Sequence, residues 1–372
     1  MYRPSIKSKR TLIFLMLLSA ALFYWSENSR VQVRQPNYDL KIQAARKMQQ
    51  ALETLRRNRA DAGWALDEVN DPNQSALVGL QYSLITTDQG DLGAKLTTIN
   101  PNFAAVILQM LIDAGVQKGD RVAVAFTGSF PALNIAVIVA CETLEVTPVI
   151  VTSVGSSMWG ANEPEFTYLD MEKILFDQGI IRHRSVAASI GGGEDIGRSL
   201  SQAGRMLIEE AIQRNNVPLI AGKSLEENIH QRRVIYNEHA QGNPYKVFIN
   251  VGGGAAVLGS NEVGGMIPPG LNSVYRPMNY PAKGLLLQIW KEGIPVIHLL
   301  NVDKIAESYG LPRSPVPLPP VGSGKIFKVE KYNMKIAGFS AALLFVVLLA
   351  IVLLDRDKYK LREEGVDPDT LI

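Results

Sequence analysis

The sequence predicts an α/β protein with a mostly parallel, doubly wound sheet, flanked by an N-terminal and a C-terminal transmembrane helix. Three observations lead to this prediction. Short apolar runs alternate with helical patterns in the middle of the chain. These runs are continuous in Val, Ile and Ala, as in strands buried on both faces. Two long uncharged segments, 11–25 and 336–354, lie near the two ends.

The predicted strands are the apolar runs themselves. They cover residues 121–126, 147–154, 185–190, 246–251 and 294–300. Helical patterns lie between them and before the first of them. The predicted helices cover 100–115, 131–144, 167–179, 224–242 and a segment from Gly193 to about Arg214. Strands separated by helices predict parallel neighbours, with Gly-rich strand-to-helix loops at one edge of the sheet and helices on both faces.

The first uncharged segment, 11–25, follows the basic residues Arg3, Lys7, Lys9 and Arg10. Its helix would be roughly 22 Å long, a little shorter than the hydrocarbon layer of a bilayer. A cleaved signal peptide has a similar hydrophobic length. The aromatic cluster Phe23–Trp25, which suits a membrane interface, favours an uncleaved anchor.

The second uncharged segment, 336–354, is bounded by Lys335 and Asp355 and would form a helix of roughly 28 Å. Two spans place both termini on the same side of a membrane. The basic residues before the first span favour a cytoplasmic N-terminus. We therefore expect a two-pass protein of the cell membrane, with residues 1–10 and 355–372 in the cytoplasm and an extracytoplasmic central domain.

Two segments connect these spans to the α/β domain, which is expected over 100–311. Residues 26–99 are predicted to be a helical stalk and entry region. Their amphipathic helix at 38–59 is equally consistent with ordinary domain packing. Residues 312–335 contain the run PRSPVPLPP, which predicts a stiff, extended tether to the membrane.

Composition excludes several functions. Hydrophobic residues are 47% of the 372, too many for a disordered chain. The 38 Lys and Arg nearly balance the 36 Asp and Glu, so a nucleic-acid-binding surface is not expected. Cys141 is the only cysteine, which excludes an intrachain disulfide and a cysteine metal cluster. The four histidines show no metal-binding spacing, and we expect neither a metal site nor a cofactor.

Three glycine-rich loops follow predicted strands and form the candidate ligand-binding site. In parallel sheets ligands bind beyond the carboxyl ends of strands, and open backbone N–H groups there favour anions. No loop has the Walker lysine or complete GxGxxG spacing, and glycines also serve tight turns and close packing. The candidate residues in these loops are Gly128, Ser129, Gly191, Gly192, Gly193, Asp195, Gly252, Gly253 and Gly254.

Candidate catalytic residues are fewer. Ser129 lies at a strand-to-helix turn, but TGSFP lacks the GxSxG pattern of a hydrolase elbow, and a helix N-cap is the favoured interpretation. The polar loop 155–170 contains Ser156, Ser157, Trp159, Asn162, Glu163, Glu165 and Asp170. Trp159 and Asn162 suit ligand recognition, and the three carboxylates suit acid–base chemistry. A solvated loop with Trp159 packed inward is the alternative.

Four segments carry a family resemblance. They are VAVAFTGSFPALNIAV (122–137), SSMWGANEPEFTYLDME (156–172), RSVAASIGGGEDIGRSLS (184–201) and VFINVGGGAAVLG (247–259). The chain resembles the poly-γ-glutamate system protein family of the PgsW type. This resemblance implies a role in bacterial poly-γ-glutamate production beside an amide ligase and its membrane partner proteins. It implies no catalytic residues.

Two classes of function fit these observations. The first is an accessory protein of poly-γ-glutamate synthesis or export, whose outward domain guides or tethers the carboxylate polymer or scaffolds the synthesis complex. The second is an extracytoplasmic hydrolase or transferase that trims, releases or attaches the polymer with Ser129 or with the carboxylates of the polar loop. The near-neutral charge argues for local contacts through backbone N–H groups rather than a broad electrostatic track.

Overall fold

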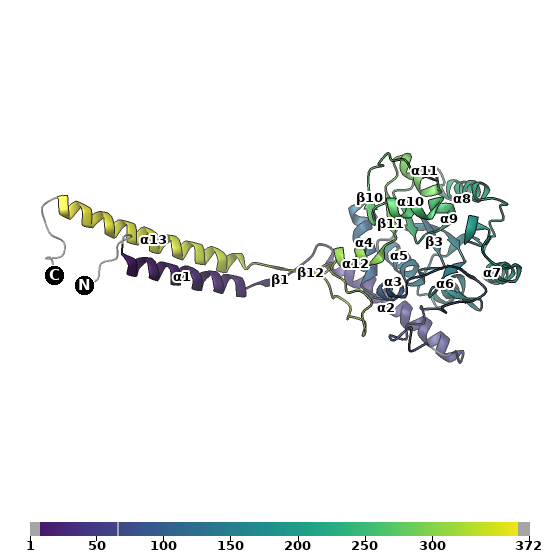
Figure 1. The fold of residues 1–372 in the computed structure, drawn as a ribbon, viewed down its shortest axis with the longest axis horizontal. Helices are drawn as coiled ribbons and strands as arrows, with labels where there is room; N and C mark the ends of the chain where they lie inside the picture. Colours follow the sequence, from purple (N-terminus) through teal and green to yellow (C-terminus); the bar gives the residue numbers. More distant parts are fainter. Residues whose placement is uncertain (1–7, 65–66, 364–372) are drawn as a thin grey trace. The chain divides into compact units, whose positions relative to one another are not determined.

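The computed structural model describes residues 8–64 and 67–363, with side chains described up to Asp355. The chain divides into two compact units. One unit combines Met1–Gln35 with Lys328–Ile372, and the other is Pro36–Phe327, called the body below. Figure 1 traces the chain through both units.

The first unit contains two helices that are long and apolar enough to cross a membrane. They are α1 (Lys9–Asn28) and α13 (Met334–Glu363), which lie side by side (Figure 1) with Trp25 edge-on to Phe339. Strand β1 (Val31–Arg34) pairs antiparallel with β12 (Lys328–Lys331). Both helices were predicted, and each extends beyond the uncharged segment that predicted it.

The body is mixed α/β with a mainly parallel central sheet, as predicted. The sheet has six strands, one more than the five that the sequence predicted. The strand order is β10-β11-β9-β3-β4-β8. The strands are β3 (Arg121–Thr127), β4 (Thr147–Ser153), β8 (Ser185–Ser189), β9 (Phe248–Val251), β10 (Gly270–Asn272) and β11 (Val296–Leu299). All pairings are parallel except β10 with β11. The sequence did not predict β10, because its three residues carry no apolar run.

The apolar runs form strands because both faces of the sheet are buried. In β3, Val122, Val124 and Phe126 join one hydrophobic cluster, while Ala123 and Ala125 join another on the opposite face. The first cluster includes α2 (Tyr38–Asp61), α4 (Phe103–Asp113) and α5 (Pro131–Thr143). The second includes α8 (Leu225–Ala240) and α11 (Leu285–Lys291). Because both faces are covered by helices, the strands need apolar residues at successive positions and not only at alternate ones.

Three other helices complete the part of the fold that concerns the site. Helix α3 (Leu92–Thr98) precedes α4, α6 (Tyr168–Asp177) follows the polar loop, and α7 (Gln202–Arg214) follows the second glycine loop. The predicted helix after Gly193 is interrupted, since only the short 3₁₀ turn Gly193–Asp195 forms before α7. Glu194 and Asp195 both have positive φ, which an α-helix does not tolerate.

Helix α2 belongs to the body, so the stalk predicted over 26–99 differs from the structure. Ala44, Met48 and Leu55 on its apolar face are fully buried against α4 and α5. The amphipathic pattern reflects domain packing, the alternative that the sequence left open. The body begins at Pro36, well before residue 100.

The proline-rich segment also lies on the body instead of forming a free tether. The carbonyl oxygen of Pro315 accepts a hydrogen bond from Asn73, and that of Pro320 accepts one from Asn102. The backbone N–H of Ser314 donates to Thr97 Oγ1. Prolines have no N–H, but their carbonyl oxygens remain acceptors for the amides of half-buried Asn73 and buried Asn102. The body ends at Phe327.

Candidate functional site

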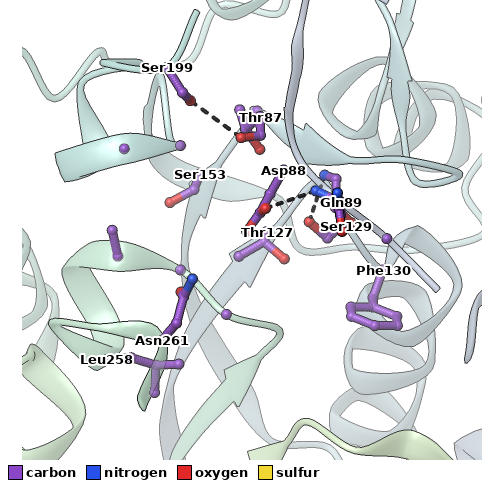
Figure 2. Close-up of a pocket in the computed structure, with 18 of the residues that line it drawn as sticks. Thr87, Asp88, Gln89, Thr127, Ser129, Phe130, Ser153, Ser199, Leu258 and Asn261 are labelled. Carbon is purple, nitrogen blue, oxygen red and sulfur yellow. Dashed lines mark hydrogen bonds between the residues drawn. The ribbon is translucent and has the colours of Figure 1, made fainter. Parts of the chain in front are cut away.

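A cavity of about 530 Å³ lies at the carboxyl ends of the parallel strands. Thr127 ends β3 and Ser153 ends β4, and both lie in the cavity wall (Figure 2). Strand β3 lies between β4, which follows it in sequence, and β9, which comes much later. Crossovers that leave a strand in opposite directions open a crevice at this edge of a sheet. The other lining residues are Thr87, Asp88, Gln89, Gly90, Asp91, Lys95, Ser129, Phe130, Gly155, Ser157, Gly192, Gly193, Ser199, Gly253, Gly254, Ala255, Leu258, Asn261 and Leu300.

The three predicted glycine loops meet at this cavity. Ser129 comes from the first, Gly192 and Gly193 from the second, and Gly253 and Gly254 from the third. The structure therefore brings together three loops that are well separated in sequence, at 127–131, 191–197 and 252–254. Loops that follow parallel strands lie close together because the carboxyl ends of these strands share one edge of the sheet.

Three of the candidate glycines do not line the cavity, and each has a conformational or packing reason. Gly191 and Gly252 have φ of +79° and +83°, in the left-handed region that favours glycine. A Cβ at Gly128 would lie 2.3 Å from the carbonyl oxygen of Val154. The tight-turn and close-packing interpretation therefore describes these three positions.

The third loop offers backbone donors. The N–H groups of Gly253 and Gly254 donate to no backbone acceptor within residues 8–64 and 67–363. Gly253 is exposed, and a Cβ built on it would meet nothing within 4 Å. Such N–H groups at the wall of a cavity can donate to an anionic or carbonyl oxygen.

Ser129 is not a helix cap, so that part of the prediction was wrong. Helix α5 starts at Pro131 with Phe130 in the N-cap position and no side-chain cap. The Ser129 hydroxyl oxygen instead accepts a hydrogen bond from the backbone N–H of Ser157, with N and Oγ 3.0 Å apart. Ser129 thus joins the first glycine loop to the polar loop.

Lys95 is one of the cavity residues that the sequence analysis did not identify. Its side chain from α3 is buried, and its Nζ contacts the backbone carbonyl oxygen of Ser129. Nζ lies 3.0 Å from Ser157 Oγ and 3.8 Å from the centroid of the Phe130 ring. Burial lowers the pKa of the Lys95 ammonium to about 7, and nearby Asp91 opposes this effect. No sequence signal joins these three residues, since Ser129 and Ser157 lie in separate loops and Lys95 lies in no motif.

The carboxylates of the polar loop lie elsewhere. Glu163 forms a two-pronged ion pair with Arg59 of α2, with N–O distances of 2.7 and 3.0 Å. Asp170 completes a capping box with Thr167 at the start of α6 and pairs with Arg214. Glu165 is exposed. None of the three lines the cavity, and the two paired carboxylates hold elements of the body together.

Trp159 and Asn162 also lie outside the cavity lining. Asn162 is fully buried, and its side-chain amide bonds both the N–H and the carbonyl oxygen of Leu80. The backbone N–H of Trp159 donates to the same carbonyl oxygen. Both residues therefore attach the polar loop to the segment around Leu80.

Asp195 holds the second glycine loop in place through buried side-chain contacts. Its carboxylate accepts hydrogen bonds from the hydroxyls of Ser153 and Ser189, and it pairs with Arg232 of α8 at 3.0 Å. Both charged side chains are fully buried. Asp195 does not line the cavity, so it positions the loop instead of facing a ligand.

Metal ligands do not cluster within the described ranges: no group of three His, Cys, Asp or Glu side chains there could hold an ion. His298 is buried, with its ring nitrogens near Asn250 and the carbonyl oxygen of Gly264. Burial lowers the His298 pKa to about 4. Cys141 is buried and free, and burial raises the pKa of its thiol.

Comparison with known proteins adds no relative: no family model matches the chain, and no curated protein or solved structure matches it significantly.

Proposed function

We propose that this chain is a membrane-anchored accessory protein of bacterial poly-γ-glutamate synthesis or export, whose outward-facing body guides or tethers the carboxylate polymer. One observation carries the proposal. The cavity at the strand ends is walled by glycine loops, and the N–H groups of Gly253 and Gly254 have no backbone acceptor in the described chain.

The anchoring part of the proposal is supported by α1 and α13. Their apolar side chains stay exposed in the first unit, among them Leu12 and Phe14 of α1 and Phe345 of α13. Exposed apolar surface of this extent is unfavourable in water and favourable in lipid. The basic residues Arg3, Lys7, Lys9 and Arg10, which precede the uncharged segment 11–25, support a cytoplasmic N-terminus, and two spans would then leave the body outside the cell.

The polymer-binding part follows from the chemistry of the cavity. A γ-linked glutamate chain has a neutral amide backbone and one carboxylate on each repeat. Its carboxylates can accept hydrogen bonds from the loop N–H groups, which needs no excess of basic side chains. The formal net charge of +2 agrees with local contacts of this kind. A doubly wound sheet supports the same placement, because its ligands bind where the strand order reverses.

The pathway and its partners rest on the family resemblance of the four segments. A poly-γ-glutamate ligase and its membrane partner proteins are the partners it implies. If the body only scaffolded these proteins, substitutions in the cavity wall would leave function intact. The effect of such substitutions on function therefore distinguishes a guiding role from a purely scaffolding one.

Two substitutions at Gly253 that differ from each other only in charge test polymer binding. The full chain is placed in lipid nanodiscs, and binding of γ-linked glutamate oligomers is measured by calorimetry. Gly253→Asp and Gly253→Asn place side chains of nearly equal size at a position where a Cβ meets nothing. We expect Asp to weaken binding about tenfold or more at low salt, by repulsion of the carboxylates, and Asn to weaken it far less.

Two results would contradict the proposal. One is the absence of saturable binding by the wild-type chain. The other is an equal effect of Asp and Asn at position 253, which would mean that the polymer carboxylates do not approach this loop. γ-Linked glutamine oligomers serve as the uncharged ligand control, and we expect them to bind much more weakly than the glutamate oligomers.

A further inference from the structure

We propose that Ser157 and Lys95 form a serine–lysine pair that cleaves or transfers acyl groups in the cavity, with Ser157 as nucleophile and Lys95 as general base. The inference rests on the proposed function only for the identity of the acyl donor. The chemistry itself requires an amide or ester carbonyl that enters the cavity.

The geometry of the pair carries this inference. Lys95 Nζ and Ser157 Oγ are 3.0 Å apart, within the reach that proton transfer to a general base requires. Both residues lie in the cavity wall. A serine hydroxyl is a weak nucleophile until an adjacent base takes its proton, and lysine is one of the residues that perform this task.

The surroundings of Lys95 favour its uncharged form. Its side chain is buried, and the contacts of Nζ are the Ser129 carbonyl oxygen, the Ser157 hydroxyl and the face of Phe130. Among the described residues no carboxylate forms a salt bridge with it. Burial makes the ammonium form costly, and this effect outweighs the opposing charge of nearby Asp91, so the pKa of Lys95 falls to about 7. A neutral amine can donate to the Ser129 carbonyl and accept the Ser157 proton.

Ser129 acts as a positioning residue in this arrangement. Its hydroxyl oxygen accepts the backbone N–H of Ser157, and its carbonyl oxygen holds Lys95 Nζ. One residue of the first glycine loop therefore contacts both members of the pair. This places the serine and the lysine on a common support, and it explains why Ser129 lies at the cavity although it caps no helix.

The proposed reaction balances without a cofactor. Ser157 Oγ bonds to the carbonyl carbon while its proton passes to Lys95 Nζ. The carbon–nitrogen or carbon–oxygen bond of the donor then breaks, and Lys95 returns the proton to the leaving amine or alcohol. Water or an acceptor amine attacks the acyl-Ser157 ester, Lys95 takes its proton, and Ser157 Oγ leaves with that proton. The products are a carboxylic acid or a new amide.

Covalent labelling tests the pair without knowledge of the natural donor. An alkyl fluorophosphonate reacts with an activated serine to form a phosphonyl ester and release fluoride and a proton. The full chain in detergent is treated with this probe, and the adduct is located by peptide mass mapping. We expect the adduct on Ser157, its loss in Ser157→Ala, and its retention in Ser308→Ala, which alters an exposed serine of α12 (Val302–Ser308).

Lys95 has a matched control in Lys41. Lys41 is also buried, with its Nζ 3.1 Å from the carbonyl oxygen of Ile326, and burial also lowers its pKa. We expect Lys95→Met to slow labelling about 100-fold or more, since general-base catalysis has this magnitude, and Lys41→Met to leave the rate unchanged. The wild-type rate should rise with pH and level off above pH about 7, as Lys95 loses its proton.

The pH profile uses the wild-type chain, so it remains informative if a Lys95 variant fails to fold. Absence of an adduct on folded wild-type protein, an adduct on Ser129, or a rate independent of pH across neutrality would each overturn the pair. Polymer binding is measured separately. Polymer binding without Ser157 labelling would contradict only the serine–lysine pair. Labelling without polymer binding would contradict only the proposed poly-γ-glutamate ligand.

Discussion

The carboxylate of Asp195 and the guanidinium of Arg232 form an ion pair 3.0 Å long in which both side chains are fully buried. Arg232 also donates to the hydroxyls of Ser153 and Ser189, at the ends of two neighbouring strands. One arginine of α8 therefore ties the second glycine loop to β4 and β8. The loop that walls the cavity is held by a charge pair that water does not reach.

Removal of Arg232 should be strongly destabilising. Arg232→Met leaves the Asp195 carboxylate buried without its partner, and we expect the free energy of unfolding to fall by about 3–5 kcal/mol. Chemical denaturation of the full chain in detergent, followed by tryptophan fluorescence, measures this change. Arg233→Met is the control, because Arg233 pairs with the half-exposed Glu292 and should contribute only about 0–1 kcal/mol. Equal effects of the two substitutions would contradict the assignment.

Glu172 should make stability depend on pH. Its side chain is fully buried, and this desolvation raises its pKa to about 7, while the N–H and hydroxyl of Ser185 oppose the shift. The folded state thus favours the protonated acid. Its contribution is complete below the ordinary pKa of 4.5 and is lost as pH rises through 7, at up to about 1.4 kcal/mol per pH unit.

Glu172→Gln should remove this dependence, since a neutral amide can donate to the hydroxyl of Ser185 and accept from its N–H. Denaturation at pH 5 and pH 8 measures the effect in both proteins. We expect the variant to lose less stability than the wild type between these two values. A wild-type chain more stable at pH 8 than at pH 5, relative to the variant, would show that the pKa is not raised.

Glu163 should matter for stability and not for chemistry. Glu163→Gln breaks the ion pair with Arg59, and we expect a loss of about 1–3 kcal/mol because hydrogen bonds to a charged group are removed. The rate of Ser157 labelling should stay at the wild-type value, because Glu163 does not line the cavity. The exposed Glu165 offers a comparison, and Glu165→Gln should change neither quantity. A labelling defect in Glu163→Gln alone would return this carboxylate to the catalytic candidates.

The single buried cysteine makes the membrane orientation easy to measure. Cys141 is inaccessible, and burial raises the pKa of its thiol, so it should not react with a maleimide. Val69 is 86% exposed on the body, and Val69→Cys supplies one reactive thiol. We expect an impermeant maleimide to label this variant in intact cells. Labelling that appears only after permeabilisation would place the body in the cytoplasm.

Much of the fold could be predicted because its strands are buried on both faces. Runs such as RVAVAF have no polar alternation, and this pattern leaves few alternatives to a central parallel strand. Strand β10 escaped prediction because it lies at the edge of the sheet and contains only Gly270, Leu271 and Asn272. Its existence depends on pairing with β11.

The limits of the body were harder to predict. The apolar face of an amphipathic helix packs against another apolar surface, but the helix sequence does not specify which one. The pattern of α2 was therefore consistent with a stalk as well as with a helix packed on the body. The proline-rich run likewise predicted an extended backbone, which is what Asn73 and Asn102 bind. In both cases the missing information was a contact between distant segments.

For the candidate site, local sequence determined the glycine loops and the polar loop, because turns that require glycine and strands that end in open N–H groups are encoded by neighbouring residues. It also determined the two apolar helices at the ends. Only the tertiary structure decided which of these residues line one cavity. It also decided that Glu163 and Asp170 form ion pairs with arginines, and that Lys95 contacts Ser157. The physical reason is that the low pKa of Lys95 arises from burial by segments far away in the chain, and burial is a property of the packed body.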